Sequence, residues 1–283
     1  QAGIPKDVFQ VVLGAKEAGE ALLELPMDGY FFTGSYNTGK YIAERVAGKL
    51  VRVGLELGGK DPMYVCEDVD VKSAAISGME GTFYNNGQSC CAVERIYVHE
   101  KIYDEYVSAF LENAKQMKIG DPTKEETFLG PLTRQAQIQV LTDQVSDAVS
   151  KGGNLLMGGK TMEGVGYYFE PTILTNVDHT MKVMMDESFG PIIGIQKVKD
   201  DEEALKLMLD TPYGLTSAVY TQDQARAESI MANMNSGNVY WNCCDRVSPN
   251  IPWSGRGNSG LGSTLSHAGI RTFVQPKSYH LRG

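Results

Sequence analysis

The sequence predicts an α/β fold built around a parallel β-sheet. Short apolar runs rich in β-branched and aromatic residues alternate along the chain with longer segments whose apolar residues recur at helical spacing. Of the 283 residues, 42% are hydrophobic and 22% are charged, which is ordinary for a globular protein with a packed core. Strands that alternate with helices usually lie parallel, because each helix carries the chain back across the sheet before the next strand begins.

The first third of the chain predicts strands and helices in alternation. The expected strands are "FQVVLG" at 9–14, "YFFTG" at 30–34, "VRVGLEL" at 51–57 and "PMYVC" at 62–66. A helix is expected over "TGKYIAERVAGKL" at 38–50, which places its apolar residues at helical spacing. A second helix is expected from about Asp70 to Tyr84, with the Asp70 carboxylate as its N-cap.

The same alternation continues to residue 242. A strand is predicted by "ERIYVH" at 94–99, and a long helix by "KIYDEYVSAFLENAKQMK" at 101–118. Further helices are expected at 133–151, 201–210 and 223–234, and further strands near 167–174, 191–198, 217–221 and 238–242. Residues 243–266 are rich in Gly, Ser, Pro and Asn and predict a loop. The closing "RTFVQPKSYHL" at 271–281 predicts a detached strand that pairs elsewhere, for instance on a neighbouring subunit.

Charge and cysteine content argue against several classes of protein. The 26 Lys+Arg against 35 Asp+Glu give a net charge of -9, which opposes binding to nucleic acid or to anionic membranes. The sequence contains no apolar run near the roughly 20 residues that span a bilayer, and "QAGIPKDVFQ" lacks the pattern of a signal peptide. We therefore expect a cytoplasmic protein, with an organelle as the alternative. The five cysteines include two adjacent pairs and no clustered His, which predicts reduced thiols and no metal site.

Two glycine-containing stretches have residues suited to chemistry. "FTGSYNTGKYI" places Gly34 and Gly39 between a strand and a helix, where backbone N–H groups and the helix dipole favour a phosphate. An ordinary turn with a helix cap is the alternative. "LELGGKDP" ends a strand at Glu56, where partial burial raises the pKa of a carboxyl group towards the range useful for a general base. A solvated or ion-paired Glu is the alternative there.

Two further stretches combine a turn with reactive or charged side chains. Cys90 and Cys91 follow a loop marked by Gly87 and Gln88, and such a loop can leave one sulfur facing a cavity. Two inert, packed thiols are the alternative. The fourth stretch, "MMDESFGPI", predicts a rigid turn before an apolar strand, and a plain connecting loop is its alternative.

Taken together, these motifs closely resemble the aldehyde dehydrogenase superfamily. "FTGSYNTGKYI", "LELGGKDP", "FYNNGQSCCA" and "ESFGP" occur in the family's order, with Cys90 34 positions after Glu56, and "EPTIL" and "PWSGRGNSG" agree with it. The resemblance covers essentially the whole chain. It implies the C-terminal part of a Rossmann-type NAD(P)-binding domain at 1–57, a parallel-sheet catalytic domain at 58–258, and a return segment with an oligomerisation strand at 259–283.

The resemblance also implies a reaction, in which an aldehyde is oxidised to a carboxylic acid through a thiohemiacetal and a thioester on cysteine. Cys90 matches the family's nucleophile, and Glu56 matches the base that activates water against the thioester. Asn242 matches a loop position that the family places near the catalytic thiol. The implied cofactor is NAD or NADP, with contacts at Gly34, Ser35, Leu57, Gly58, Glu187 and Phe189.

On the substrate side, the resemblance places Tyr84, Cys91 and Trp253 along an aldehyde tunnel. Two aromatic rings favour apolar or aromatic aldehydes through buried area, and a quaternary ammonium group held by cation–π attraction is the alternative. The implied partners are a small aldehyde and further copies of the chain in a homodimer or homotetramer, with no nucleic acid and no membrane.

Family members carry a further N-terminal portion that has no counterpart in this sequence. It holds the first strands of the cofactor domain, the Asn of the oxyanion hole and the Lys that binds the adenosine ribose. We therefore expect the isolated chain to be inactive or nearly so. Two alternatives stay open, namely a cofactor-independent esterase that uses Cys90 and Glu56, and a structural fragment without activity.

Overall fold

The structure is a computed structural model that describes residues 3–164, 166–244 and 246–283. Its largest unit is a seven-stranded sheet with the strand order β10-β9-β3-β4-β7-β6-β5, in which β5 is antiparallel to β6 and the other neighbours run parallel. The strands are β3 (Asp61–Val65), β4 (Val93–His99), β5 (Asn154–Met157), β6 (Thr172–Thr175), β7 (Ile192–Val198), β9 (Thr216–Tyr220) and β10 (Asn238–Trp241). The predicted α/β class with a parallel sheet is confirmed.

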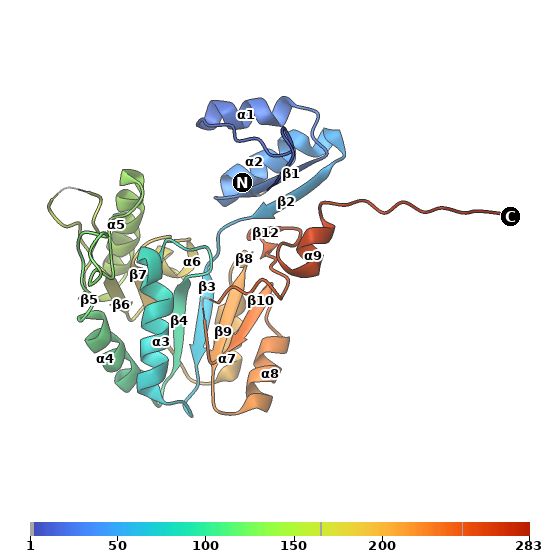
Figure 1. Ribbon diagram of the computed structural model, residues 1–283. Helices are drawn as coiled ribbons and strands as arrows, with labels where there is room; N and C mark the ends of the chain where they lie inside the picture. Colours follow the sequence, from blue (N-terminus) through green and yellow to red (C-terminus); the bar gives the residue numbers. More distant parts are fainter. Residues whose placement is uncertain (1–2, 165, 245) are drawn as a thin grey trace.

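A three-stranded sheet lies beyond one end of the large sheet (Figure 1). In it, β1 (Gly29–Thr33) runs parallel to β2 (Arg52–Glu56), and β12 (Gly260–Leu261) pairs antiparallel with β2. This sheet is accompanied by α1 (Lys16–Glu24), α2 (Tyr36–Val46) and the 3-10 turn η1 (Ala47–Lys49). The chain returns to it after a two-stranded pairing of β8 (Tyr213–Gly214) with β11 (Arg256–Gly257).

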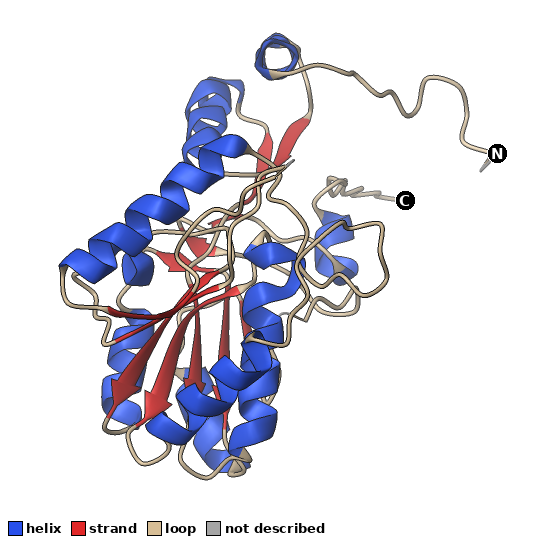
Figure 2. Cartoon of the chain, turned by 90° about the vertical axis from the view of Figure 1, so that its left-hand side faces the viewer, coloured by secondary structure: helices blue, strands red, loops and turns tan. Residues whose placement is uncertain are grey.

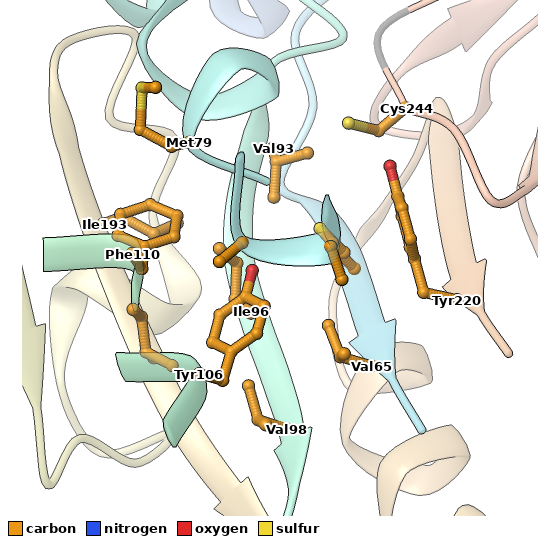
Figure 3. Packing of buried hydrophobic residues seen from close by; sticks show 14 of the residues in the cluster. Val65, Met79, Val93, Ile96, Val98, Tyr106, Phe110, Ile193, Tyr220 and Cys244 are labelled. Atoms are coloured by element: carbon orange, nitrogen blue, oxygen red, sulfur yellow. The ribbon is translucent and has the colours of Figure 1, made fainter. Parts of the chain in front are cut away.

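Alternate side chains of the central strands pack into cores on opposite faces of the large sheet. Met63 and Val65 of β3 pack with α3 (Val71–Phe83) and α4 (Tyr103–Ala114). Tyr64 and Cys66 belong to the core formed with α5 (Gln135–Ser150), α6 (Lys182–Met185), α7 (Asp201–Leu209) and α8 (Gln224–Ala232). Figure 3 shows the first core, where rings from α4 lie against β4. A sheet buried on both faces explains why its strands read as nearly continuous apolar runs.

The parallel strands of the large sheet all begin at the edge that faces the small sheet. In Figure 2 the arrowheads of these strands point to the opposite end of the molecule. The loops that enter β3, β4, β7 and β9 therefore meet at one edge, and β2 ends next to it. Lys60, Cys90, Glu187 and Leu215 each lie on one of these loops.

Helix α3 begins where the sequence predicts it. Oδ1 of Asp70 accepts hydrogen bonds from the backbone N–H groups of Lys72 and Ser73 at 3.1 and 3.2 Å. This N-cap satisfies donors that the helix cannot pair internally. It fixes the start of the helix that leads directly into the Cys90 loop.

The strand predicted at 9–14 is wrong. Residues 9–14 have no regular structure, and Phe9 and Leu13 are 74% and 91% exposed. Residues 271–281 form no strand within this chain: α9 (Ser266–Arg271) ends there and an exposed tail follows, which leaves the body of the protein (Figure 1), so pairing of this segment with a neighbouring subunit stays a prediction. A strand needs a neighbour for its backbone N–H and C=O groups, and hydrophobic alternation cannot show whether the chain provides one.

Smaller differences concern the lengths of elements. Helix α4 ends at Ala114, four residues before the predicted end at Lys118, and the four-residue β5 was not predicted. The short strands β11 and β12 lie within the predicted loop at 243–266. In the described part of the chain, no helix is both long and apolar enough to cross a membrane.

Candidate active site

The Cys90 loop is shaped by three consecutive residues with left-handed backbone. Asn85, Asn86 and Gly87 have φ values of 51°, 60° and 67°, and they turn the chain from η2 (Tyr84–Gly87) towards β4. The amide of Asn86 anchors the turn by donating to the carbonyl oxygen of Gly130 at 2.8 Å. A Cβ atom on Gly87 would collide with the carbonyl oxygen of Gly190. The loop therefore lies directly against the "ESFGP" turn.

The two adjacent thiols have different environments. Cys91 is 3% exposed, and its Sγ lies 3.4 Å from Oγ of Ser89. Cys90 is half-buried, next to Cys91 and Trp253 in a small apolar cluster. A hydrogen bond from the Cys91 side chain lowers the pKa of Cys90, against the opposing effects of burial and of the negative charge on Glu56. The thiolate form is thereby favoured at Cys90, which is the form that acts as a nucleophile.

Glu56 is the last residue of β2, and its carboxylate is held from the far end of the chain. The Thr264 hydroxyl donates a hydrogen bond to its Oε1 at 3.0 Å. Burial raises the pKa of Glu56, and hydrogen bonds from the side chains of Thr264 and Trp253 oppose that effect. Because the charge of Glu56 acts on the pKa of Cys90, the structure brings the predicted base and the predicted nucleophile together.

Glu187 reaches into the same site from the loop before β7. Its Oε1 accepts a hydrogen bond from the backbone N–H of Gly59 at 3.2 Å, and the carboxylate occupies the space where a side chain on Gly58 would lie. Burial, with repulsion from Glu94, raises the pKa of Glu187 to about 7. Glu187 and Gly58, which were predicted as separate cofactor contacts, thus touch each other.

A buried ion pair that the sequence analysis missed fixes the "ESFGP" turn. Glu94 accepts hydrogen bonds from Nζ of Lys60 at 2.8 Å, from N–H of Ser188 at 2.8 Å and from N–H of Phe189 at 2.9 Å. Lys60 also donates to Oγ of Ser188 at 3.0 Å. These bonds hold Phe189 at a φ of 45°, in the left-handed region that a bulky residue rarely adopts.

The predicted cofactor residues at 34–57 surround the start of α2. The hydroxyl of Ser35 accepts a hydrogen bond from Thr38 N–H at 3.5 Å as the N-cap, and the N–H of Gly34 donates to the carbonyl of Glu56 at 3.1 Å. The side chain of Leu57 fills the space beside Gly39. A cavity of about 640 Å³ lies between α1, β1 and α2, with Leu23, Phe32 and Ile42 among its lining residues. Apolar walls next to a helix N-terminus fit a nucleoside joined to phosphate.

A second cavity, of about 460 Å³, opens next to the cysteines. Tyr84 and Cys91 line it, together with Glu80, Phe128 and Arg246. Tyr84 is 60% exposed, so its ring lies at the open side of the cavity. Trp253 is 6% exposed and packs with Cys91 in the apolar cluster. Of the three predicted substrate residues, two therefore line this cavity and the third supports the sulfurs.

The structure ties Asn242 to strand β9. Its Oδ1 accepts from the N–H of Thr221 at 3.0 Å, and its Nδ2 donates to the carbonyl of the same residue at 2.9 Å. Both polar ends of the amide are therefore engaged with backbone. The catalytic role of Asn242 that the resemblance implied stays a prediction, and the described contacts give this residue a structural one.

The sequence analysis also missed Thr264. It lies in the predicted loop at 243–266, and no motif in the sequence around it indicates a contact with Glu56. Lys60 and Glu94 lie inside or beside the quoted motifs, but nothing in the sequence showed that the two side chains pair. Only the pairing of β3 with β4 brings Lys60, which precedes β3, next to Glu94 of β4.

Comparison with known proteins agrees with this arrangement of residues. A protein-family model described as "Aldehyde dehydrogenase family" matches residues 1–279. "Aminoaldehyde dehydrogenase 1, peroxisomal" of Pisum sativum is 38% identical over 281 residues, which are 98% of this chain and 56% of that relative. The chain thus spans about half the length of the curated relatives it matches.

Solved structures give the same picture. The crystal structure of an NAD-dependent aldehyde dehydrogenase from Sinorhizobium meliloti matches with a TM-score of 0.94 at 33% identity, covering 96% of this chain and 55% of that one. The betaine aldehyde dehydrogenase of Staphylococcus aureus, solved in complex with NAD+, matches with a TM-score of 0.88 at 30% identity, covering 92% of this chain and 53% of that one.

Proposed function

The chain belongs to the aldehyde dehydrogenase family, and on that premise we propose that it carries the nucleophile and the base of an NAD(P)-dependent aldehyde dehydrogenase. The observation that carries the proposal is the meeting of Cys90 and Glu56. A thiol whose pKa is lowered lies within the electrostatic reach of a carboxyl group whose pKa is raised. Groups with such shifted pKa values suit a nucleophile and a general base working near neutral pH.

The first half of the reaction forms an acyl group on sulfur. The Cys90 thiolate adds to the aldehyde carbon, so that a C–S bond forms and the carbonyl electron pair moves to oxygen. We assign the backbone N–H of Cys90 as a donor to that oxyanion. NAD or NADP, when bound, supplies the acceptor for the hydride that leaves the carbon. Loss of the hydride restores the C=O bond and leaves a thioester on Cys90.

The second half releases the acid. Glu56 takes a proton from water as the water oxygen attacks the thioester carbon, and the C–S bond breaks to return the Cys90 thiolate. The half-buried carboxylate suits this step because burial raises its pKa and therefore its basicity. Glu56 also raises the pKa of Cys90. We therefore assign Cys90 to the first half-reaction, as nucleophile, and Glu56 to the second, as base.

We assign the cofactor to the edge between the two sheets. Gly34 and Ser35 would hold the pyrophosphate at the start of α2, Leu57 and Gly58 the nicotinamide, and Glu187 with Phe189 the nicotinamide ribose. The apolar cavity between α1, β1 and α2 supports the adenosine end of this assignment. It agrees with a division into residues 1–57 for cofactor binding, 58–258 for catalysis and 259–283 for return and oligomerisation.

The substrate we propose is a small aldehyde that enters past Tyr84. The cavity beside Cys91 supports this route. Tyr84 and Trp253 favour an apolar or aromatic aldehyde, and an aldehyde with a cationic group is the alternative, since the relatives above are named for aminoaldehydes and betaine aldehyde. We place the protein in the cytoplasm, with an organelle as the alternative.

We also propose a homodimer or homotetramer joined through the tail. The tail carries Val274, Tyr279 and Leu281 at 57–86% exposure, a surface that a second copy would cover. Deletion of the last ten residues should lower the oligomeric mass measured by light scattering. An unchanged mass would contradict the proposal.

Thiol labelling tests the assignment of the nucleophile without any cofactor. The chain is treated with iodoacetamide, and the labelling rate of each cysteine is read by peptide mass spectrometry. Cys243 is the matched control, because it is also half-buried while burial raises its pKa. We expect Cys90 to react faster than Cys91 and Cys243. Equal labelling rates at the three cysteines would contradict the assignment and favour a structural fragment without activity.

Ester hydrolysis then distinguishes an aldehyde dehydrogenase from a cofactor-independent esterase. Hydrolysis of a p-nitrophenyl ester is measured with and without NAD, and oxidation of an aldehyde is measured with NAD. Each assay is run with this chain alone and again with the N-terminal segment of a relative added. Ester hydrolysis without NAD, and no aldehyde oxidation under any condition, would favour the cofactor-independent esterase. Aldehyde oxidation in the complete enzyme supports the dehydrogenase.

A further inference from the structure

Asp61 is a buried carboxyl group that the proposed reaction does not use. It is the first residue of β3 and is 2% exposed. Its Oδ2 accepts a hydrogen bond from the Thr216 hydroxyl at 2.6 Å, whereas Oδ1 is buried without a hydrogen-bond partner among the residues that the structure describes. An ionised carboxylate with one bare oxygen in such a place carries a large desolvation cost.

The bare oxygen lies beside the backbone of the nucleophile. A Cβ atom placed on Gly59 would stand 2.7 Å from Oδ1 of Asp61 and 2.8 Å from the carbonyl oxygen of Cys90. Both oxygens therefore face the same side of Gly59. Two oxygen atoms that carry only lone pairs repel each other there, whereas a carboxylic acid O–H next to a carbonyl can act as a donor.

The charges around Asp61 also favour its neutral form. Burial is the largest cause that raises its pKa well above the usual range, and the negative charges of Cys90 and Glu94 add to it, against the hydrogen bonds from Thr216. Two cations beside this site, Lys60 and Arg95, are engaged with other groups. Lys60 binds Glu94 and Ser188. Arg95 donates to the carbonyl of Lys60 at 2.9 Å, to the carbonyls of Leu207 and Met208, and to the Tyr97 hydroxyl.

We propose that Asp61 is a neutral carboxylic acid in the folded protein and a positioning residue for the nucleophile. Its side chain lies beside the backbone carbonyl of Cys90 and supports it. As a neutral group it supports that backbone without placing another negative charge close to the thiolate. An ionised Asp61 would disfavour the Cys90 thiolate by charge repulsion. The role given to Cys90 rests on the proposed function, whereas the protonation state of Asp61 can be measured without turnover.

The protonation state is tested by comparing the unfolding equilibria of the wild type and Asp61→Asn in urea between pH 5 and pH 8. Asp61 is ionised in the unfolded chain over this range. If it keeps its proton in the folded protein, the wild type loses stability relative to Asp61→Asn, and the ratio of their unfolding constants rises about tenfold per pH unit. A ratio that stays flat shows an ionised Asp61 in the folded state and overturns the proposal.

Asp201→Asn is the matched control for this comparison. Asp201 accepts hydrogen bonds from Arg226 and Tyr64, and its pKa is lowered below its ordinary value. Its loss should therefore change stability by the same factor at every pH between 5 and 8. If Asp61→Asn does not fold, Asp61→Ser replaces it in the comparison, because serine also removes the ionisable group.

The positioning role is tested on Cys90 itself. We expect Asp61→Asn, which keeps the shape of the neutral acid, to retain the wild-type pH profile of iodoacetamide labelling at Cys90 within about twofold. Asp61→Ala removes the support and should slow labelling at every pH. Faster labelling of Asp61→Asn at low pH would mean that a negative charge had been removed, and it would contradict the proposal. Failure of Cys90 to label in any variant would instead contradict the proposed function.

Discussion

The Thr264 hydroxyl donates a hydrogen bond to Oε1 of Glu56 although 208 positions separate the two residues in the sequence. Thr264 is itself fixed, because its backbone N–H and C=O both pair with Trp253 at 2.8 Å. The carboxylate proposed as the base is therefore oriented by the return segment that also carries the buried Trp253. This contact leads to the first prediction.

Replacing Thr264 with Val should raise the pKa of Glu56, because the hydrogen bond that favours the charged carboxylate is lost. The rise of p-nitrophenyl ester hydrolysis with pH should move to higher pH, since Glu56 acts only when ionised. A hydrogen bond to a charged group contributes about 1.5 kcal/mol or more, so the rate measured well below the midpoint of that rise should fall roughly tenfold. Thr264→Ser keeps the hydroxyl and should keep the wild-type profile. An identical shift in both variants would mean that the effect comes from packing.

Glu56→Gln should change the two half-reactions in opposite directions. The negative charge of Glu56 raises the pKa of Cys90, so its removal should speed iodoacetamide labelling of Cys90 near neutral pH. Ester turnover should fall by roughly 10²–10⁴ because the general base is lost. Both rates are measured on the same preparation. Unchanged turnover would show that Glu56 is not the base.

Cys90→Ala should abolish aldehyde oxidation measured with the N-terminal segment of a relative present, because no thioester can form without the sulfur. Cys91→Ala should retain oxidation, but at a lower rate near neutral pH, because the hydrogen bond that lowers the pKa of Cys90 is lost. Steady-state kinetics with a set of aldehydes measures both variants. Activity in Cys90→Ala would disprove the assignment of the nucleophile.

Glu187→Gln should flatten the pH dependence of stability. The pKa of Glu187 is raised from 4.5 to about 7, so between these values the folded protein holds a proton that the unfolded chain has lost. Stability from this group is therefore present below pH 4.5 and is lost as the pH rises towards 7, by roughly 3 kcal/mol at most. Urea unfolding of the wild type and the variant at pH 5 and pH 7 measures the difference. An unchanged slope would contradict the raised pKa.

Lys60→Met should destabilise the fold by about 3–5 kcal/mol, because it leaves Glu94 as a buried charge without its cation. The side chains of Lys60 and Glu94 are 0% and 6% exposed. Lys199→Met is the control, since Lys199 pairs with Asp200 at the surface and is 67% exposed, where solvent screens the pair and its loss should hardly change stability. The free energy of unfolding of each variant is compared with the wild type. Equal, small losses would show that the buried pair does not hold the turn.

The sequence predicts the fold class and most elements because burial on both faces of a parallel sheet leaves apolar runs that are easy to read. The Asp70 cap shows this best, since a single carboxylate before an apolar periodic segment marked the start of α3 correctly. Residues 9–14 show the limit. Their alternation fits a strand, but a strand forms only beside a partner, and a linear pattern does not contain that information.

The site was predictable where chemistry is local to a motif and not where it depends on contacts between distant residues. The resemblance pointed to Cys90 and Glu56, and in the structure the charge of Glu56 acts on the pKa of Cys90. Lys60 precedes β3 and pairs with Glu94 of the neighbouring β4, and Thr264 reaches Glu56 from the opposite end of the chain, so only the folded arrangement reveals these contacts. Asn242 shows the reverse case, in which a motif position proves to bind backbone in the structure.

The proposed nucleophile and base belong to different sheets. Cys90 precedes β4 of the seven-stranded sheet, Glu56 ends β2 of the three-stranded sheet, and the short segment 57–60 joins β2 to β3. With an ester substrate, whose acyl transfer to sulfur needs no cofactor, substitutions that tilt the small sheet should therefore affect release of the acyl group more than its formation. A protein engineer can thus adjust the lifetime of the acyl group on sulfur separately from the rate of its formation. A longer lifetime would allow a nucleophile other than water to attack the thioester.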